Sequence, residues 1–237
     1  NQLYYQRYPD DVQRVREIVD VLERENITLP QGDRLTARRF QQLGLAFGMS
    51  DGFERIHYLV EHAFVDGANG RELGYAFLCD FEQSFEFQTN PIFAILHESI
   101  YGNGAATAWA AERVRAEYLA FEIKPDQPVF FTGEMIYSWM FDEYRYLKPL
   151  KAAADLLAAY ADWTPLYDVS VLEKNTVPVA AAVYYNDMYV ERAYSEETAQ
   201  HINGIRLWVT NEYEHNGLRA DGVHILDRLM SMARGER

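Results

Sequence analysis

The 237-residue sequence predicts an α/β chain that is predominantly helical, with its strands confined to the last third. Apolar residues recur at spacings of three and four through the first half, which places them on one face of successive helices. The run Val177–Tyr185 is short, apolar and unbroken, as in a buried parallel strand, and Ile205–Thr210 has the composition of a second strand. We therefore expect a helical region over 1–165 and a strand–helix–strand–helix portion over 166–237.

Each expected helix of the first half lies between turn signals. Pro30–Asp33, Ser50–Gly52 and Gly67–Gly70 carry the proline, glycine and aspartate residues that interrupt helices. The helices expected from the periodicity are Asp10–Arg24, Thr36–Phe47, Phe53–Phe64, Arg71–Ser84, Pro91–Tyr101 and Ala105–Phe121.

The last third predicts a parallel strand pair with crossover helices. A short helix over Ser195–His201, with Ser195 as its N-cap, separates the two strands, and a final helix covers about Asp221–Met232. Two parallel strands do not form a stable sheet alone, so further strands are expected from residues upstream of Asn1. The start, which has neither methionine nor a convincing helix cap, also favours a fragment.

Composition excludes several classes of partner. The formal net charge of −14 opposes binding to nucleic acid or to anionic membrane surfaces. No stretch approaches the roughly 20 apolar residues needed to span a bilayer. Cys79 is the single cysteine, so no intrachain disulfide can form, and a reducing, cytoplasmic location is expected.

Two residues that could carry chemistry follow the two expected strands. Asp187 follows the first strand, and His215 follows the second. Reactive groups of open α/β sheets lie just past the carboxyl ends of the strands. In α/β-hydrolases the catalytic triad runs in the order Ser, then Asp or Glu, then His. Asp187 and His215 match the last two members in type, order and place, and we expect their side chains to lie within hydrogen-bonding reach.

Five segments resemble the larger proline iminopeptidases. They are Arg7-Tyr-Pro-Asp-Asp-Val, Leu35-Thr-Ala-Arg-Arg-Phe-Gln, Phe47-Gly-Met-Ser-Asp-Gly-Phe-Glu, Phe131-Thr-Gly-Glu-Met-Ile-Tyr and Val177-Pro-Val-Ala-Ala-Ala-Val-Tyr-Tyr-Asn-Asp-Met-Tyr-Val. The resemblance implies an α/β-hydrolase with an inserted helical cap, here 1–165, and the C-terminal part of the hydrolase domain, here 166–237. It also implies a serine peptidase that removes N-terminal proline from peptides without a cofactor, with Asp187 as the triad acid and His215 as the base.

The nucleophile elbow of such an enzyme is not expected within this sequence. A nucleophile elbow requires Gly-x-Ser-x-Gly on a strand-to-helix turn. This spacing occurs once in the 237 residues, at Gly48-Met49-Ser50-Asp51-Gly52, but there it forms a turn between two expected helices and does not follow an expected strand. We therefore expect the chain alone to be inactive. Its expected partner is the N-terminal hydrolase half, in the same polypeptide or as a separate chain.

Carboxylates of the helical region are candidates for binding the substrate's free amino group, as the cap does in the family that the chain resembles. Glu98 and Glu134 each lie in a largely apolar stretch, where a charge needs a partner. We expect them to approach each other across a pocket that faces His215. Tyr137 and Trp139, together with Tyr101 and Phe141, are candidates for the apolar pocket of a proline ring.

Other functions remain open at this point. Glu54-x-x-His57 and Glu212-x-x-His215 have a spacing seen in di-iron bundles, but the second motif follows a strand, so we expect no metal site. A non-catalytic peptide-binding module would keep the pocket without turnover. A different α/β-hydrolase, such as an esterase or an epoxide hydrolase, would not need carboxylates that bind an amine.

Overall fold

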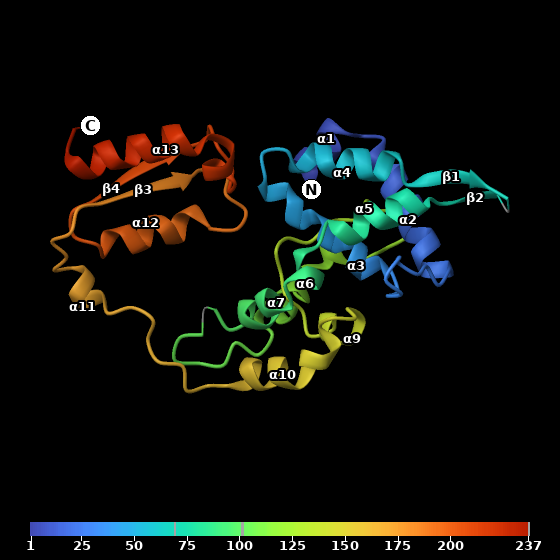
Figure 1. Cartoon of the computed structure of the whole chain (residues 1–237), viewed down its shortest axis with the longest axis horizontal. Helices are drawn as coiled ribbons and strands as arrows, with labels where there is room; N and C mark the ends of the chain where they lie inside the picture. Colours follow the sequence, from blue (N-terminus) through green and yellow to red (C-terminus); the bar gives the residue numbers. More distant parts are fainter. Residues whose placement is uncertain (69, 101, 237) are drawn as a thin grey trace. The chain divides into compact units, whose positions relative to one another are not determined.

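The computed structural model describes residues 1–68, 70–100 and 102–236 (Figure 1). Packing divides the chain into two compact units. Unit 1 comprises Asn1–Leu45 and Glu54–Pro165, and unit 2 comprises Ala46–Phe53 and Leu166–Arg237. The short segment Ala46–Phe53 therefore packs with the last third of the chain, although it lies within the first third of the sequence.

Unit 1 is built almost entirely from short helices. In chain order they are α1 (Gln2–Arg7), α2 (Asp11–Arg24), α3 (Ala37–Gln41), η1 (Gln42–Gly48, which runs into unit 2), α4 (Gly52–Glu61, which begins in unit 2), α5 (Tyr75–Gln83), α6 (Glu86–Thr89), α7 (Pro91–His97), α8 (Ala110–Arg115), η2 (Leu119–Phe121), α9 (Met140–Glu143), η3 (Lys148–Leu150) and α10 (Lys151–Ala159). Helix α2 buries Val15, Ile18, Val19 and Leu22, the face that the apolar spacing predicted.

A β-hairpin takes the place of the end of the helix expected over Phe53–Phe64 and of the start of the helix expected over Arg71–Ser84. Strand β1 (Phe64–Gly67) pairs antiparallel with β2 (Gly70–Leu73). Gly70 has a positive φ of 108°, which an L side chain rarely adopts and which supports the tight reversal. The helix expected from Arg71 therefore begins only at Tyr75. The strand residues are mostly exposed, so the apolar pattern that marks a strand is weak here.

Two other expected helices are shorter than the periodicity indicated. Ala108 and Trp109 have positive φ values of 49° and 56°, so α8 begins at Ala110 rather than Ala105. Left-handed backbone cannot continue a right-handed helix. Helix α7 ends at His97, and Tyr101, which was expected at its end, lies outside the described residues.

The core of unit 1 is aromatic. Phe40 lies at its centre, with ring centroids 5.6 Å from Phe131 and 6.3 Å from Phe81. Arg39 is also fully buried, forms an ion pair with Asp33 at 3.3 Å, and stacks over the ring of Tyr144. The buried charge is thus paired as well as packed.

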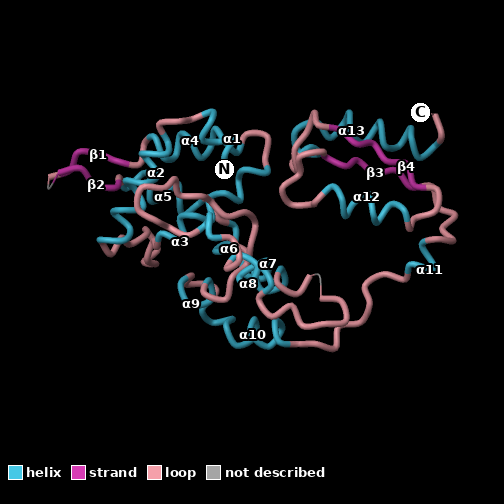
Figure 2. The backbone as a smooth tube through the Cα atoms, turned by 180° about the vertical axis from the view of Figure 1, so that it is seen from behind, coloured by secondary structure: helices cyan, strands magenta, loops and turns pink. Residues whose placement is uncertain are grey.

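Unit 2 contains the predicted strand–helix–strand–helix order. Strands β3 (Val179–Tyr184) and β4 (Ile205–Thr210) pair in parallel, in register from Val179 with Ile205 to Tyr184 with Thr210. Helix α12 (Arg192–Gln200) lies on one side of the strand pair and α13 (Gly217–Arg234) on the other (Figures 1 and 2). A short helix, α11 (Val169–Leu172), precedes them. The mixed, predominantly helical class predicted from sequence is confirmed.

The helix boundaries of unit 2 differ from expectation. Helix α12 begins at Arg192, and the side chain of Glu191 accepts a hydrogen bond from the backbone N–H of Ala193. The prediction that Ser195 is the N-cap is wrong, because Ser195 lies inside the helix. Helix α13 begins at Gly217 and has a kink at Asp221, the residue at which the helix was expected to begin.

Helices of the described residues are either too short or too polar to cross a bilayer.

Candidate functional site

Asp187 and His215 are hydrogen-bonded to each other. The Nδ1 atom of His215 lies 3.0 Å from Oδ2 and 3.2 Å from Oδ1 of Asp187. Asp187 stands in the turn after β3, and His215 stands in the loop after β4. Because the carboxyl ends of parallel strands meet at one edge of a sheet, the short distance follows from the topology. The predicted proximity of the two side chains is therefore present.

The carboxylate of Asp187 is held in place by its own turn. Oδ1 accepts hydrogen bonds from the backbone N–H groups of Tyr189 and Val190, at 2.8 and 3.0 Å. The side chain is only 6% exposed. Because a carboxylate can only accept, Nδ1 of His215 carries the proton of this pair. The lone pair on Nε2 is then the basic site of the ring.

The His215 ring is partly open to solvent and is packed on one side. Its side chain is 38% exposed, and its ring centroid lies 4.4 Å from that of Tyr189, at an interplanar angle of 35°. Tyr189 therefore contacts both members of the pair, through its backbone N–H and through its ring. This arrangement fixes the ring while leaving part of it accessible.

A cavity of about 390 Å³ lies beside the pair. Its lining includes Asp187 and His215, and most of the remainder is apolar. Ser195 also lines this cavity, but within the described part of the chain no hydrogen bond joins Ser195 to His215. The cavity offers an acid–base pair next to an apolar wall.

Glu214 adds a second carboxylate next to the histidine. Burial, followed by the nearby charge of Asp187, raises the pKa of Glu214 above its usual value. Sequence reasoning did not select this residue, although it lies directly beside His215 in the chain.

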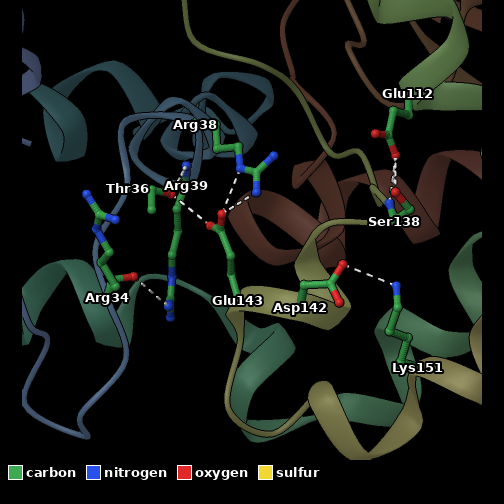
Figure 3. A network of polar contacts seen from close by, with 9 residues as sticks. All are labelled: Arg34, Thr36, Arg38, Arg39, Glu112, Ser138, Asp142, Glu143 and Lys151. Atoms are coloured by element: carbon green, nitrogen blue, oxygen red, sulfur yellow. Dashed lines mark hydrogen bonds and ion pairs between the residues drawn. The ribbon is translucent and has the colours of Figure 1, made fainter. Parts of the chain in front are cut away.

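The aromatic candidates of unit 1 form a stack. The rings of Tyr137 and Trp139 are nearly parallel, with centroids 5.5 Å apart and an interplanar angle of 13°. The guanidinium of Arg38 lies over the ring of Trp139 at 4.5 Å. Glu143 holds that guanidinium, with Nε of Arg38 at 2.8 Å from its Oε1, and also accepts a hydrogen bond from Thr36 (Figure 3). Trp139 is thus ordered by its neighbours, whereas Tyr137 is buried.

The predicted carboxylate ligands Glu98 and Glu134 are both half-buried. Glu98 Oε1 accepts a hydrogen bond from the backbone N–H of Ala110, at 3.3 Å, at the start of α8. The role of both residues as ligands of a substrate ammonium stays a prediction.

A further half-buried carboxylate of unit 1 was not selected from sequence. Glu112 Oε2 accepts hydrogen bonds from the backbone N–H and the hydroxyl of Ser138, at 2.9 and 2.6 Å (Figure 3). Ser138 lies between Tyr137 and Trp139, so Glu112 anchors the segment that carries the aromatic stack. No local pattern could indicate this contact, because it joins residues 26 positions apart.

The two Glu-x-x-His motifs have other partners. Glu54 pairs with Arg7, and Nδ1 of His57 lies 2.9 Å from Asp11. Glu212 contacts the hydroxyl of Thr210. The described residues contain no group of three or more His, Cys, Asp or Glu side chains arranged to hold a metal ion.

Two curated proteins are similar to this chain over nearly its whole length. A proline iminopeptidase from Aeromonas sobria is 50% identical over 234 residues, which are 99% of this chain and 54% of the relative. The proline iminopeptidase aneH from Aspergillus aculeatus is 34% identical over 233 residues, 98% of this chain and 52% of the relative. No protein-family model matches the sequence. The resemblance to proline iminopeptidases is confirmed, and the chain spans about half the length of the curated relatives that it matches.

Proposed function

We propose that this chain is the acid–base part of a proline iminopeptidase, a serine peptidase of the α/β-hydrolase fold that releases N-terminal proline from peptides. The observation that carries the proposal is the hydrogen bond between Asp187 and His215 at the carboxyl ends of β3 and β4. The similarity to two proline iminopeptidases supports the choice of substrate.

In the proposed reaction His215 is the general base. Its Nε2 takes the proton of a serine hydroxyl as that oxygen attacks the prolyl carbonyl carbon, and gives the proton to the leaving amine as the C–N bond breaks. A water molecule, which loses a proton to the same Nε2, then attacks the prolyl ester, and the serine oxygen leaves with that proton as proline is released. Asp187 accepts from Nδ1 throughout and stabilises the imidazolium that forms. The serine and the oxyanion-hole donors come from an N-terminal hydrolase half outside this sequence, because the one Gly-x-Ser-x-Gly of this chain, Gly48–Gly52, joins η1 to α4 and does not follow a strand.

In the proposed enzyme, residues 1–165, apart from the Ala46–Phe53 segment of unit 2, act as the helical cap that selects the substrate. Tyr137 and Trp139 provide an apolar surface for the proline ring. Glu98 and Glu134 provide charge-assisted hydrogen bonds to the protonated amine of the substrate. This requirement separates an aminopeptidase from an esterase or epoxide hydrolase, which has no amine to bind. We place the enzyme in the cytoplasm, where Cys79, the single cysteine of this chain, stays reduced.

The test compares the 237-residue chain with a protein in which it is joined to the N-terminal half of a related enzyme. The joined protein should cleave a prolyl chromogenic substrate, and His215→Ala should abolish that activity. The chain alone should not cleave it. An N-blocked prolyl substrate should be resistant, whereas comparable turnover of blocked and free substrates would favour an esterase-like hydrolase.

Turnover by the 237-residue chain alone, lost in His215→Ala, would contradict the proposed division of the triad. Ser195→Ala and Ser50→Ala would then decide whether the nucleophile is the serine that shares the cavity with His215 or the serine of Gly48–Gly52. Binding of a prolyl peptide by the joined protein without any turnover would favour the non-catalytic module instead.

A further inference from the structure

The loop that carries His215 is fastened to a segment from the first third of the sequence, Ala46–Phe53, within unit 2. The backbone N–H of His215 donates a hydrogen bond to the carbonyl of Gly48, at 3.2 Å. This bond joins the backbone of His215 to a residue that lies 167 positions earlier in the sequence.

The next residue of the loop makes a two-point contact with the same segment. Oδ1 of Asn216 accepts from the backbone N–H of Ser50 at 3.1 Å, and Nδ2 of Asn216 donates to Oγ of Ser50 at 3.0 Å. Both ends of the Asn216 amide are therefore used. Because an amide held at both ends has little rotational freedom, this contact fixes the start of α13 and the residue before it.

Gly48 also fits against the ring that packs on His215. A Cβ atom added at Gly48 would lie 2.0 Å from Cε2 of Tyr189, well inside the closest distance that Cβ atoms tolerate. Tyr189 in turn packs on the His215 ring and donates its N–H to Asp187. The absence of a side chain at Gly48 therefore lets Tyr189 occupy its place between the segment and the acid–base pair.

We propose that Ala46–Phe53 is a positioning element for the general base, with Gly48, Ser50 and Asn216 setting the place of His215. This inference rests on the proposed function for its catalytic part. The element acts on the backbone of His215 and, through Tyr189, on one face of its ring, while Asp187 acts on Nδ1. The contacts of Gly48, Ser50 and Asn216 described above involve the loop backbone and Tyr189, and not Nε2 of His215. Loss of the element should therefore reduce the rate of the chemical step and leave substrate binding unchanged.

The variants form matched pairs. Asn216→Ala removes both amide contacts, and its control, Asn203→Ala, removes a side-chain hydrogen bond to the carbonyl of Asn175 in the same unit. Gly48→Ala introduces the clash with Tyr189, and its control, Gly222→Ala, places a methyl group where no atom lies within 4 Å. Ser50→Ala removes the hydroxyl contact but keeps the backbone one.

The first measurement uses the 237-residue chain and needs no activity. In a ¹H–¹⁵N spectrum of the side chains, Asn216→Ala and Gly48→Ala should shift and broaden the ring signals of His215. Ser50→Ala should have a smaller effect, and the double variant of Ser50 and Asn216 should match Asn216→Ala alone. The two controls should keep the wild-type signals. Unchanged His215 signals in folded Asn216→Ala would overturn the inference. If Gly48→Ala does not fold, the Asn216→Ala spectrum alone tests the inference.

The second measurement is the kinetics of the joined protein. Asn216→Ala and Gly48→Ala should lower kcat by about 10-fold to 100-fold with KM unchanged, as expected for a misplacement of about 1 Å. An active joined enzyme whose kcat is unaffected by Asn216→Ala would overturn the inference. If the wild-type joined protein is inactive while the His215 signals respond as described, the proposed function fails and the positioning of the ring is supported.

Discussion

Asp187 and His215 are 28 positions apart in the sequence, yet Oδ2 of the aspartate lies 3.0 Å from Nδ1 of the histidine. Two backbone N–H groups, from Tyr189 and Val190, hold the carboxylate in its orientation. The aspartate is therefore prepared to set the tautomer of the ring and to stabilise its protonated form.

Replacement of this carboxylate should remove most of the activity of the joined enzyme. Asp187→Asn should lower kcat by about 10⁴-fold, because an amide can donate to Nδ1 and so favour the wrong tautomer. Asp168→Asn is the matched control, since Asp168 caps α11 in the same unit and asparagine also caps helices well. Similar kcat values for the two variants would show that Asp187 is not the triad acid.

The predicted ammonium ligands can be tested by substrate choice. Glu98→Gln and Glu134→Gln should each weaken recognition of a free prolyl amine by about 2–5 kcal/mol, because each removes a charged partner of the ammonium. The glutamine at position 98 can still accept the hydrogen bond from Ala110. Comparison of kcat/KM for free and N-blocked substrates measures the effect, with the exposed Glu117→Gln as control. If both variants distinguish free from N-blocked substrates as well as the wild type does, the ammonium is bound by other carboxylates, such as Glu112.

Glu214 should make the chain less stable as pH rises. Its pKa is raised by burial and by the charge of Asp187. The folded state therefore binds the proton more tightly than the unfolded state, in which the pKa is 4.5. The stability that protonated Glu214 contributes is fully present below about pH 4.5, and it is lost as the pH rises through the higher pKa of the folded state.

Glu214→Gln should therefore raise the unfolding temperature at pH 7, and the difference from wild type should shrink towards pH 4. Thermal unfolding followed by circular dichroism at both pH values measures it, with the exposed Glu197→Gln as control. An unfolding temperature at pH 7 equal to or below that of wild type would contradict the expected cost of the charged form.

Adjacent arginines of α3 should differ sharply in their contribution to stability. Arg39→Met should lower the free energy of unfolding by about 3–5 kcal/mol, because it removes the buried ion pair between Arg39 and the carboxylate of Asp33. Arg38→Met should cost about 1 kcal/mol or less, since Arg38 is about half exposed. Urea unfolding monitored by circular dichroism gives both values. Equal losses in the two variants would show that the buried Arg39–Asp33 ion pair contributes no more to stability than the more exposed Arg38–Glu143 pair.

Local sequence patterns were sufficient for the elements whose side chains repeat with a clear period. The apolar face of α2, the strand Ile205–Thr210 and the placement of Asp187 and His215 after consecutive strands all follow from such patterns. They succeed because each depends on residues a few positions apart, and because parallel strands bring their carboxyl ends to one edge.

Tertiary structure decided what depends on distant partners or on backbone torsions. The β1–β2 hairpin has mostly exposed residues and therefore no apolar alternation, and the start of α8 is set by the positive φ of Trp109. The contact of Gly48 with Tyr189, and the hydrogen bonds of Asn216 with Ser50, join segments more than 100 positions apart. No local period encodes such contacts, because they exist only once the strands have paired and Ala46–Phe53 has packed on the loop that follows β4.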